Sequence, residues 1–138
     1  MERTFTMIKP DGVKKALVGE IVKRYQDAGL KLVALKLTRL SKDKAEELYS
    51  VHQGRPFFME LVEFITSGPV APMVIEGDNA VSRVREIMGA TNPQEADKGT
   101  IRGDFAVEVS ENIVHGADSV ESANREIPIF FNDDELVG

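Results

Sequence analysis

The spacing of apolar residues changes repeatedly along this chain, and the order of those changes constrains the fold more than any other feature. Phe5 and Met7 recur at every second position, which is typical of a strand. From Val13 onward the interval lengthens to three or four, and an apolar stripe on residues 18–28 predicts a helix that ends before Gly29. Strand and helix thus alternate from the start of the chain.

The same alternation continues to the C-terminal third. Strands are predicted at residues 30–40, at 70–76 with Pro72 at its start or at an unpaired edge, and at 105–110, where Phe105, Val107 and Val109 alternate with smaller or polar residues. Helices are predicted after the N-cap Ser41, after Pro56, after Asp78 or Asn79 and before Gly89, and from the capping-box pair Asp118 and Glu121 to about Glu126. Residues 89–103 are predicted to form a long loop, of the kind that often carries function. This order predicts a four-stranded, largely antiparallel sheet with helices on one face, built on a split βαβ unit.

Composition excludes several classes of protein. A chain of 138 residues with 42% apolar side chains is expected to form a single domain, residues 1–138, around a sizeable core. It has no cysteine, and no apolar run approaches the roughly 20 residues that cross a bilayer. Residues 1–5 lack the apolar stretch of a secretion signal. We therefore expect a cytoplasmic protein without disulfides, thiolate metal sites or membrane contact.

The distribution of charge restricts the choice of partners. The formal net charge is −6, which disfavours binding to nucleic acid. Residues 56–138 are the acidic part of the chain and contain only five cations, which are Arg83, Arg85, Lys98, Arg102 and Arg125. A site for an anionic ligand in this part must gather its few cations locally.

The candidate nucleophile is a histidine. No Gly-rich Walker loop and no G-x-G-x-x-G motif occurs, so phosphates would need another route. His115 lies beside Gly116 between a predicted strand and a predicted helix, and Glu126 could reach back to hold one ring nitrogen, leaving the other free. Taken alone, a loop histidine is more often solvated or structural. The other histidine, His52, is expected to interact with the end of its own helix.

Two arginines and two phenylalanines are further candidates for a nucleotide site. Arg85 and Arg102 flank the aperiodic loop, and guanidinium groups pair with phosphate oxygens in bidentate fashion. Either one alone is better explained as an ordinary surface arginine. Phe57 and Phe58 together at a helix start would leave one ring free to stack on a base.

Six short segments, in register along the chain, carry a resemblance to a known family. Residues 112–119 read NIVHGADS, which resembles the active-site signature of nucleoside diphosphate kinases. Further segments resemble other blocks of that family in the same order: MIKPDGV at 7–13, RPFF at 55–58, SGPV at 67–70, GATNP at 89–93 and GTIRGDF at 99–105. The similarity extends from about Thr4 to Val137.

The resemblance implies a fold, a reaction and a set of site residues. The fold would be α+β and ferredoxin-like, βαββαβ, with additional helices and a C-terminal extension. The reaction would move the γ-phosphate of a nucleoside triphosphate to a nucleoside diphosphate in a ping-pong cycle through a phosphohistidine. His115 matches the phosphate carrier and Glu126 the carboxylate that orients it. The substrate-binding positions of the family match Lys9, Tyr49 and Asn112 near the ribose and the reacting phosphate, Arg85, Thr91 and Arg102 at the phosphates, and Phe57, Leu61 and Val109 at the base.

The resemblance also implies partners. Mg²⁺ would be bound through the nucleotide phosphates and not by a metal site of the protein. Stacking on Phe57 without hydrogen bonds to the base edge would give broad base tolerance. The protein would be a homo-oligomer, with a hexamer favoured over a tetramer, although the sequence lacks the longer C-terminal tail of many relatives.

One residue departs from the family pattern. Ala117 stands where the family usually has Ser, and a lost hydroxyl near the His115–Glu126 pair would remove about 1 kcal/mol of hydrogen bonding. Two alternatives stay open, and Ala117 favours only the first of them. A nucleotide-binding module would bind without transferring phosphate, and a DNA-binding protein would need a basic stripe that the sequence lacks.

Overall fold

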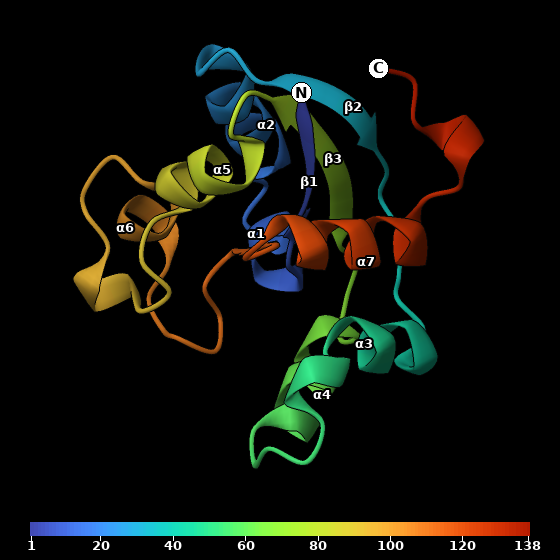
Figure 1. The fold of residues 1–138 in the computed structure, drawn as a ribbon. Coiled ribbons are helices and arrows are strands. Elements are labelled where there is room, and N and C mark those ends of the chain that lie inside the picture. The colour runs from blue at the N-terminus through green and yellow to red at the C-terminus, as the bar shows by residue number, and fades with distance from the viewer.

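Four strands form one sheet in the spatial order β2-β3-β1-β4, with every neighbouring pair antiparallel (Figure 1). This computed structural model describes residues 1–138. The strands are β1 (Glu2–Ile8), β2 (Lys31–Leu35), β3 (Ala71–Gly77) and β4 (Val114–Gly116). The helices are α1 (Pro10–Lys14), α2 (Val18–Asp27), α3 (Lys42–Leu48), α4 (Phe58–Ile65), α5 (Ala80–Met88), α6 (Ile101–Phe105) and α7 (Val120–Phe130), with 3-10 turns η1 (Ser50–His52), η2 (Pro93–Glu95) and η3 (Asp133–Glu135). The order and pairing are those of a ferredoxin-like βαββαβ unit with added helices.

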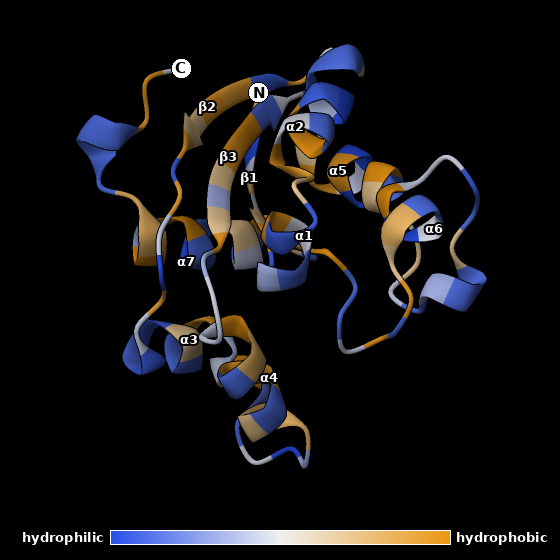
Figure 2. Ribbon diagram, turned by 180° about the vertical axis from the view of Figure 1, so that it is seen from behind, coloured by the Kyte–Doolittle hydropathy of each residue, from blue (hydrophilic) through white to orange (hydrophobic).

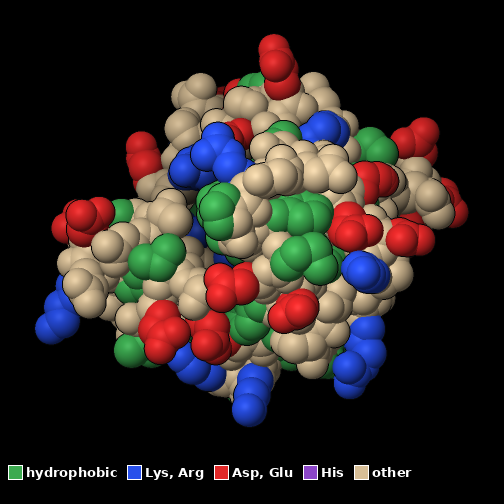
Figure 3. All heavy atoms as spheres, turned by 90° about the horizontal axis from the view of Figure 1, so that it is seen from below, with side chains coloured by type: hydrophobic (Ala, Val, Ile, Leu, Met, Phe, Trp, Pro, Cys, Tyr) green, Lys and Arg blue, Asp and Glu red, His purple; other side chains and the backbone are tan.

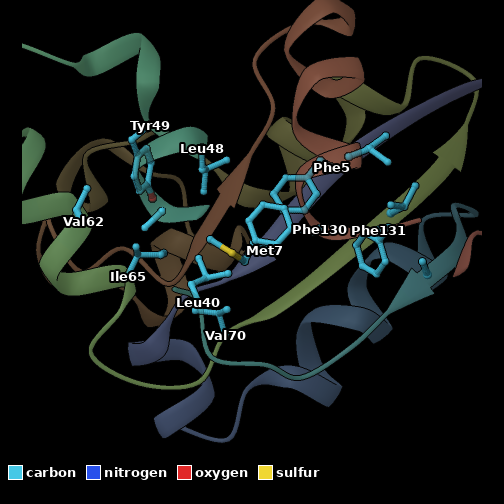
Figure 4. Close-up of a cluster of buried hydrophobic side chains, with 14 of the residues drawn as sticks. Phe5, Met7, Leu40, Leu48, Tyr49, Val62, Ile65, Val70, Phe130 and Phe131 are labelled. Carbon is cyan, nitrogen blue, oxygen red and sulfur yellow. The ribbon is translucent and has the colours of Figure 1, made fainter. Parts of the chain in front are cut away.

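Helices cover both faces of this sheet, so the prediction that they lie on one face was wrong. Successive side chains of a strand point to opposite faces. Phe5 and Met7 of β1 pack in a cluster with α3, α4 and α7, where Phe5 stacks on Phe130 at a centroid distance of 4.7 Å (Figure 4). Ile8 and Met73 belong to a second cluster with α2, α5 and α6. In Figure 2, stretches of apolar residues are seen on β2 and β3 and on parts of the helices α2, α5 and α7. A strand that is buried on both faces explains why β3 is almost continuously apolar.

Several predicted helix ends are confirmed. Gly29 follows α2 with φ +84° and Gly89 follows α5 with φ +89°, in the region of φ that favours glycine. The Ser41 hydroxyl accepts the backbone N–H of Lys44 at the start of α3.

Other predicted boundaries shift. A short helix that was not predicted, α1, precedes the helix on residues 18–28, and Pro10 occupies its first position. The helix α7 is capped by Ser119 instead of Asp118, and it continues past Glu126 to Phe130. Pro72 lies at the start of β3, but that strand is central in the sheet and not at its edge. None of the helices combines the length and apolar character needed to cross a membrane.

The largest correction concerns the fourth strand. Residues 105–110 do not form it, because Phe105 ends α6 and the residues after it are irregular. The Thr100 hydroxyl accepts the N–H of Gly103 and so starts α6 inside the segment predicted as loop. The fourth strand is Val114–Gly116, which pairs with β1 and contains His115. The histidine therefore lies on a strand and not on a loop.

Candidate active site

His115 and Glu126 form a partly buried hydrogen-bonded pair, the contact that the sequence predicted. The strand β4 places His115 opposite Met7 of β1, and α7 places Glu126 above it. Nε2 of the imidazole lies 2.7 Å from Oε1 of the carboxylate. The side chain of Glu126 is 5% exposed and that of His115 is 19% exposed, so the carboxylate is enclosed while the ring reaches solvent. Nδ1 makes no hydrogen bond to the protein.

A strained residue fixes the segment that leads into β4. Ile113 has φ +75°, which is rare for a β-branched residue. Its carbonyl accepts the N–H of Lys9 at 2.8 Å, and its N–H donates to Oδ2 of Asp11 at 3.0 Å. Both contacts come from the β1–α1 junction. The β1–α1 junction therefore holds the backbone at Ile113 and so orients the neighbouring residues Asn112 and His115.

Lys9, Asn112 and Thr91 are joined in one row. Nζ of Lys9 donates to Oδ1 of Asn112 at 2.8 Å, and Nδ2 of Asn112 donates to the Thr91 carbonyl at 3.0 Å. Burial, together with repulsion from Arg102, lowers the pKa of Lys9 to about 8, against an attraction from Asp11 that raises it. The row ties the long loop to the β1–α1 junction.

The two predicted arginines differ in their surroundings. Arg102 is buried, and its guanidinium donates to the carbonyls of Val114 at 2.8 Å, Gly89 at 3.0 Å and Asn112 at 3.4 Å. Burial and the neighbouring Arg85 lower the pKa of Arg102 to about 10, so it keeps its charge at neutral pH. Arg85 is exposed and has one long contact, 3.4 Å to the Gly116 carbonyl.

Aromatic and apolar side chains form the other wall. The buried ring of Tyr49 stands edge-on to His115 at 6.1 Å. Burial and the nearby Glu126 carboxylate raise the pKa of the Tyr49 hydroxyl. Phe57 is 41% exposed, whereas its neighbour Phe58 is 8% exposed and packs in the core. One ring of the predicted pair is thus free, as expected.

These walls line one open cavity of about 990 Å³. All the predicted site residues line it: Lys9, Tyr49, Phe57, Leu61, Arg85, Thr91, Arg102, Val109, Asn112, His115 and Glu126. The structure therefore brings together residues of α4, α5, α6, β4 and α7 with residues of the connecting segments, such as Lys9 after β1 and Tyr49 after α3. No group of three or more His, Asp or Glu side chains is arranged to hold a metal ion.

Sequence reasoning missed other residues of this cavity. His52, which was expected to interact with its helix end, instead lines the cavity, and its ring lies 5.3 Å from the Phe57 ring, centroid to centroid. Arg125 also lines it, and its presence among the few cations of the acidic half was a usable signal. The carboxylates of Glu60 and Glu111 lie at the same cavity. On the face seen in Figure 3, acidic and basic side chains are interspersed, with no continuous row of one sign.

Ala117, the residue that departs from the family pattern, is buried. Ala117 is 1% exposed and packs with Val81 and Ala123 in a small apolar cluster. Its N–H donates to the Phe5 carbonyl, which extends the pairing of β4 with β1 by one hydrogen bond.

Comparison with known proteins gives one consistent result. A family model described as "Nucleoside diphosphate kinase" matches residues 2–136. The chain is 55% identical over 136 residues to a nucleoside diphosphate kinase of Staphylothermus marinus, covering 99% of this chain and 96% of that one. It is 58% identical over 137 residues to one from Oceanobacillus iheyensis, covering 99% and 93%.

Solved structures agree with the sequence comparisons. The nucleoside diphosphate kinase of Halobacterium salinarum in complex with CDP has a TM-score of 0.96 and 50% identity, covering 99% of this chain and 91% of that one. A nucleoside diphosphate kinase family protein from Babesia bovis has a TM-score of 0.97 and 46% identity, covering 100% and 93%.

Proposed function

The chain belongs to the nucleoside diphosphate kinase family, and from this premise we propose that His115 carries the phosphoryl group between nucleotides. The reaction moves the γ-phosphate of a nucleoside triphosphate to a nucleoside diphosphate in two half-reactions. The observation that supports the assignment is the 2.7 Å contact between His115 and Glu126 inside the cavity. A carboxylate only accepts hydrogen bonds, so Nε2 carries the ring proton and Nδ1 keeps its lone pair.

The first half-reaction uses that lone pair. Nδ1 attacks the γ-phosphorus as the bond from this phosphorus to the β,γ-bridging oxygen breaks, and the diphosphate leaves with the bonding electrons. The ring then bears a phosphoryl group on Nδ1 and a proton on Nε2, and the Glu126 carboxylate offsets the charge of this imidazolium. The second half-reaction reverses these steps with another diphosphate.

The phosphate chain needs cations because the transition state is loose and its charge is spread over oxygens. Lys9, Arg85 and Arg102 supply them at the cavity, and Asn112 and Thr91 supply polar contacts. Arg102 uses its guanidinium partly to hold three carbonyls, so Arg85, which is less engaged, is the freer partner for phosphate oxygens.

The divalent cation required by this chemistry is proposed to be Mg²⁺ that arrives on the nucleotide. Mg²⁺ keeps several waters and binds substrate phosphates in preference to protein cages. When bound, it would neutralise charge on the β- and γ-phosphates.

The nucleoside is proposed to lie against Phe57, Leu61 and Val109. Phe57 and Val109 are 41% and 54% exposed, so their apolar surfaces are open to a ligand. A base that stacks on a ring is bound through its face, without hydrogen bonds to its edge. We therefore expect similar kcat/KM for purine and pyrimidine diphosphates. A preference of more than about a hundredfold for one base, equivalent to about 3 kcal/mol, would show that edge contacts decide.

The protein is proposed to form a homo-oligomer, a hexamer rather than a tetramer. The sheet ends in the edge strand β2, whose last residue, Leu35, is 42% exposed, and Leu37 just after the strand is 65% exposed. An apolar edge of this kind is a surface that proteins usually cover. Light scattering after size-exclusion chromatography distinguishes six copies from four or one.

Labelling with γ-³²P ATP tests the assignment of His115. The chain should take up label that is acid-labile, alkali-stable and removed by added diphosphate. His115→Ala should take up none, whereas His52→Ala, which removes the other histidine of the cavity, should still become labelled. Binding of nucleotide without labelling would instead identify a module that binds and does not transfer.

A further inference from the structure

Arg125 lies outside the residues assigned above, although its side chain reaches the same cavity. It is on α7, next to Glu126 in sequence. Its guanidinium donates to the carbonyls of Glu47 at 3.0 Å and Leu48 at 3.1 Å, with a longer contact of 3.4 Å to the Ser50 hydroxyl. These groups belong to the end of α3 and the turn after it. The last carbonyls of a helix have no partner within it and carry partial negative charge, so a guanidinium is well matched to them.

The same guanidinium also contacts the carboxylate that holds the nucleophile. Nη2 of Arg125 lies 3.4 Å from Oε2 of Glu126, whose other oxygen bonds His115. No other protein group bonds Oε2. One side chain thus touches both the end of α3 and the His115–Glu126 pair.

The α3–α4 hairpin, residues 42–66, carries the wall against which the nucleoside is proposed to lie. Tyr49, His52, Phe57 and Leu61 all come from it. Figure 1 shows α3 and α4 extending below the sheet, beneath α7.

Arg125 provides the only polar attachment of this hairpin to the body of the protein. Apart from bonds to the adjoining residues Ser41 and Ser67, every hydrogen bond between residues 42–66 and the rest of the chain comes from Arg125. No salt bridge joins the hairpin to another part of the chain. The remaining attachment is apolar packing, such as that of Leu48 and Ile65 against the sheet (Figure 4). Apolar contact is non-directional, whereas a planar fork of donors fixes orientation.

We propose that Arg125 is a positioning residue that sets the distance between the nucleoside-binding hairpin and the His115–Glu126 pair. The inference rests on the proposed function. A nucleoside triphosphate must contact the hairpin and present its γ-phosphate to Nδ1 at once. An error of about 1 Å in that spacing can lower the rate about a hundredfold, even when the chemical groups are intact.

A phosphoryl donor without a nucleoside separates this role from general damage. Phosphoramidate can phosphorylate His115 as its own P–N bond breaks and ammonia leaves, and it makes no use of the hairpin. Loss of Arg125 should therefore affect ATP much more than phosphoramidate.

The experiment compares Arg125→Met with Arg125→Lys and with the control Arg83→Met. Arg83 also joins two elements, because it donates to the carbonyls of Ala28 and Asp78, but it does not line the cavity. The measured quantity is the single-turnover rate of His115 phosphorylation as a function of donor concentration. Arg125→Met should lower kcat/KM with ATP by about tenfold or more, mainly through the maximal rate, because the bound nucleotide would present its γ-phosphate to Nδ1 in the wrong position. The rate with phosphoramidate should fall by no more than about threefold, since the contact with Glu126 is long.

The control and the lysine variant complete the test. Arg83→Met should leave both donors unaffected, and Arg125→Lys should recover part of the ATP rate, because an ammonium keeps the charge but cannot span both carbonyls. If Arg125→Met does not fold, Arg125→Lys carries the comparison, with the same order of effects on the two donors.

Three results would overturn the inference. They are equal losses with both donors, an unchanged rate with ATP, and an equal loss in Arg83→Met. Failure of the unsubstituted chain to label from ATP would overturn the proposed function itself, and this inference with it.

Discussion

Replacing Arg102 with methionine should destabilise the fold as well as impair phosphate binding. Arg102 is 5% exposed, and its guanidinium makes two short hydrogen bonds, to the carbonyls of Val114 and Gly89. Bonds from a charged donor contribute roughly 1.5–3 kcal/mol each. Two such bonds together contribute about 3 kcal/mol or more. Because methionine keeps part of the buried apolar contact and removes the repulsion with Arg85, we expect the free energy of unfolding to fall by the lower value, about 3 kcal/mol.

This loss converts to a measurable shift in Tm. An unfolding entropy of about 2.1 cal/mol/K per residue gives about 0.3 kcal/mol per degree for a chain of this length, so Tm should fall by about 10 °C. The assay is thermal unfolding followed by circular dichroism, without nucleotide. The control is Arg85→Met, which removes an exposed arginine with one long contact and should raise the KM for ATP while shifting Tm by no more than about 2 °C. An unchanged Tm in Arg102→Met, or equal destabilisation by the two variants, would refute this reasoning.

The remaining predictions concern pH and the apolar wall. The lowered pKa of Lys9, about 8, means that the free enzyme loses this cation as pH rises, so kcat/KM for ATP should fall through pH 8. In the unfolded chain Lys9 keeps its proton up to a pKa of about 10.4, so between pH 8 and 10 the unfolded state binds more protons than the native state. The free energy of unfolding should therefore rise with pH over this window, and Lys9→Met should remove that rise. Phe57→Ala should raise KM with little change in Tm, whereas Phe58→Ala should cost about 3 kcal/mol or more of stability, since only the second ring is in the core. If the two variants lose stability equally in urea titrations, Phe57 is a core residue and not a ligand contact.

Local signals in the sequence predicted most of the fold. Ser41, Gly29 and Gly89 act within one turn of their own positions, and such effects can be recognised without the rest of the chain. The residues after α6 were misassigned because Phe105, Val107 and Val109 alternate like a strand. Phe105 instead ends α6 and lies under the Arg24 guanidinium at 4.9 Å, a contact between residues far apart in sequence.

The true fourth strand could not be found from periodicity. The three residues of β4 are too few for a pattern, and the strand exists because it pairs with β1. That helices pack on both faces of the sheet was not predicted for a related reason. The face on which each helix packs is decided by tertiary contacts and not by the helix's own sequence.

The residues that line the cavity were easier to predict than the contacts that hold them in place. The eleven-residue separation of His115 and Glu126 allowed their contact to be anticipated, and the family motifs supplied the other lining residues. The contacts of Arg125 with main-chain carbonyls have no sequence signature, because any residue provides a carbonyl.

Transfer of the phosphoryl group to Nδ1 of His115 can be observed by ³¹P NMR of the chain with ¹⁵N-labelled histidine. After incubation with ATP and removal of nucleotide, we expect one phosphoramidate resonance, coupled to Nδ1 of His115 and lost when diphosphate is added. A resonance coupled to Nε2 or to His52, or no phosphorus–nitrogen coupling at all while nucleotide exchange proceeds, would contradict it.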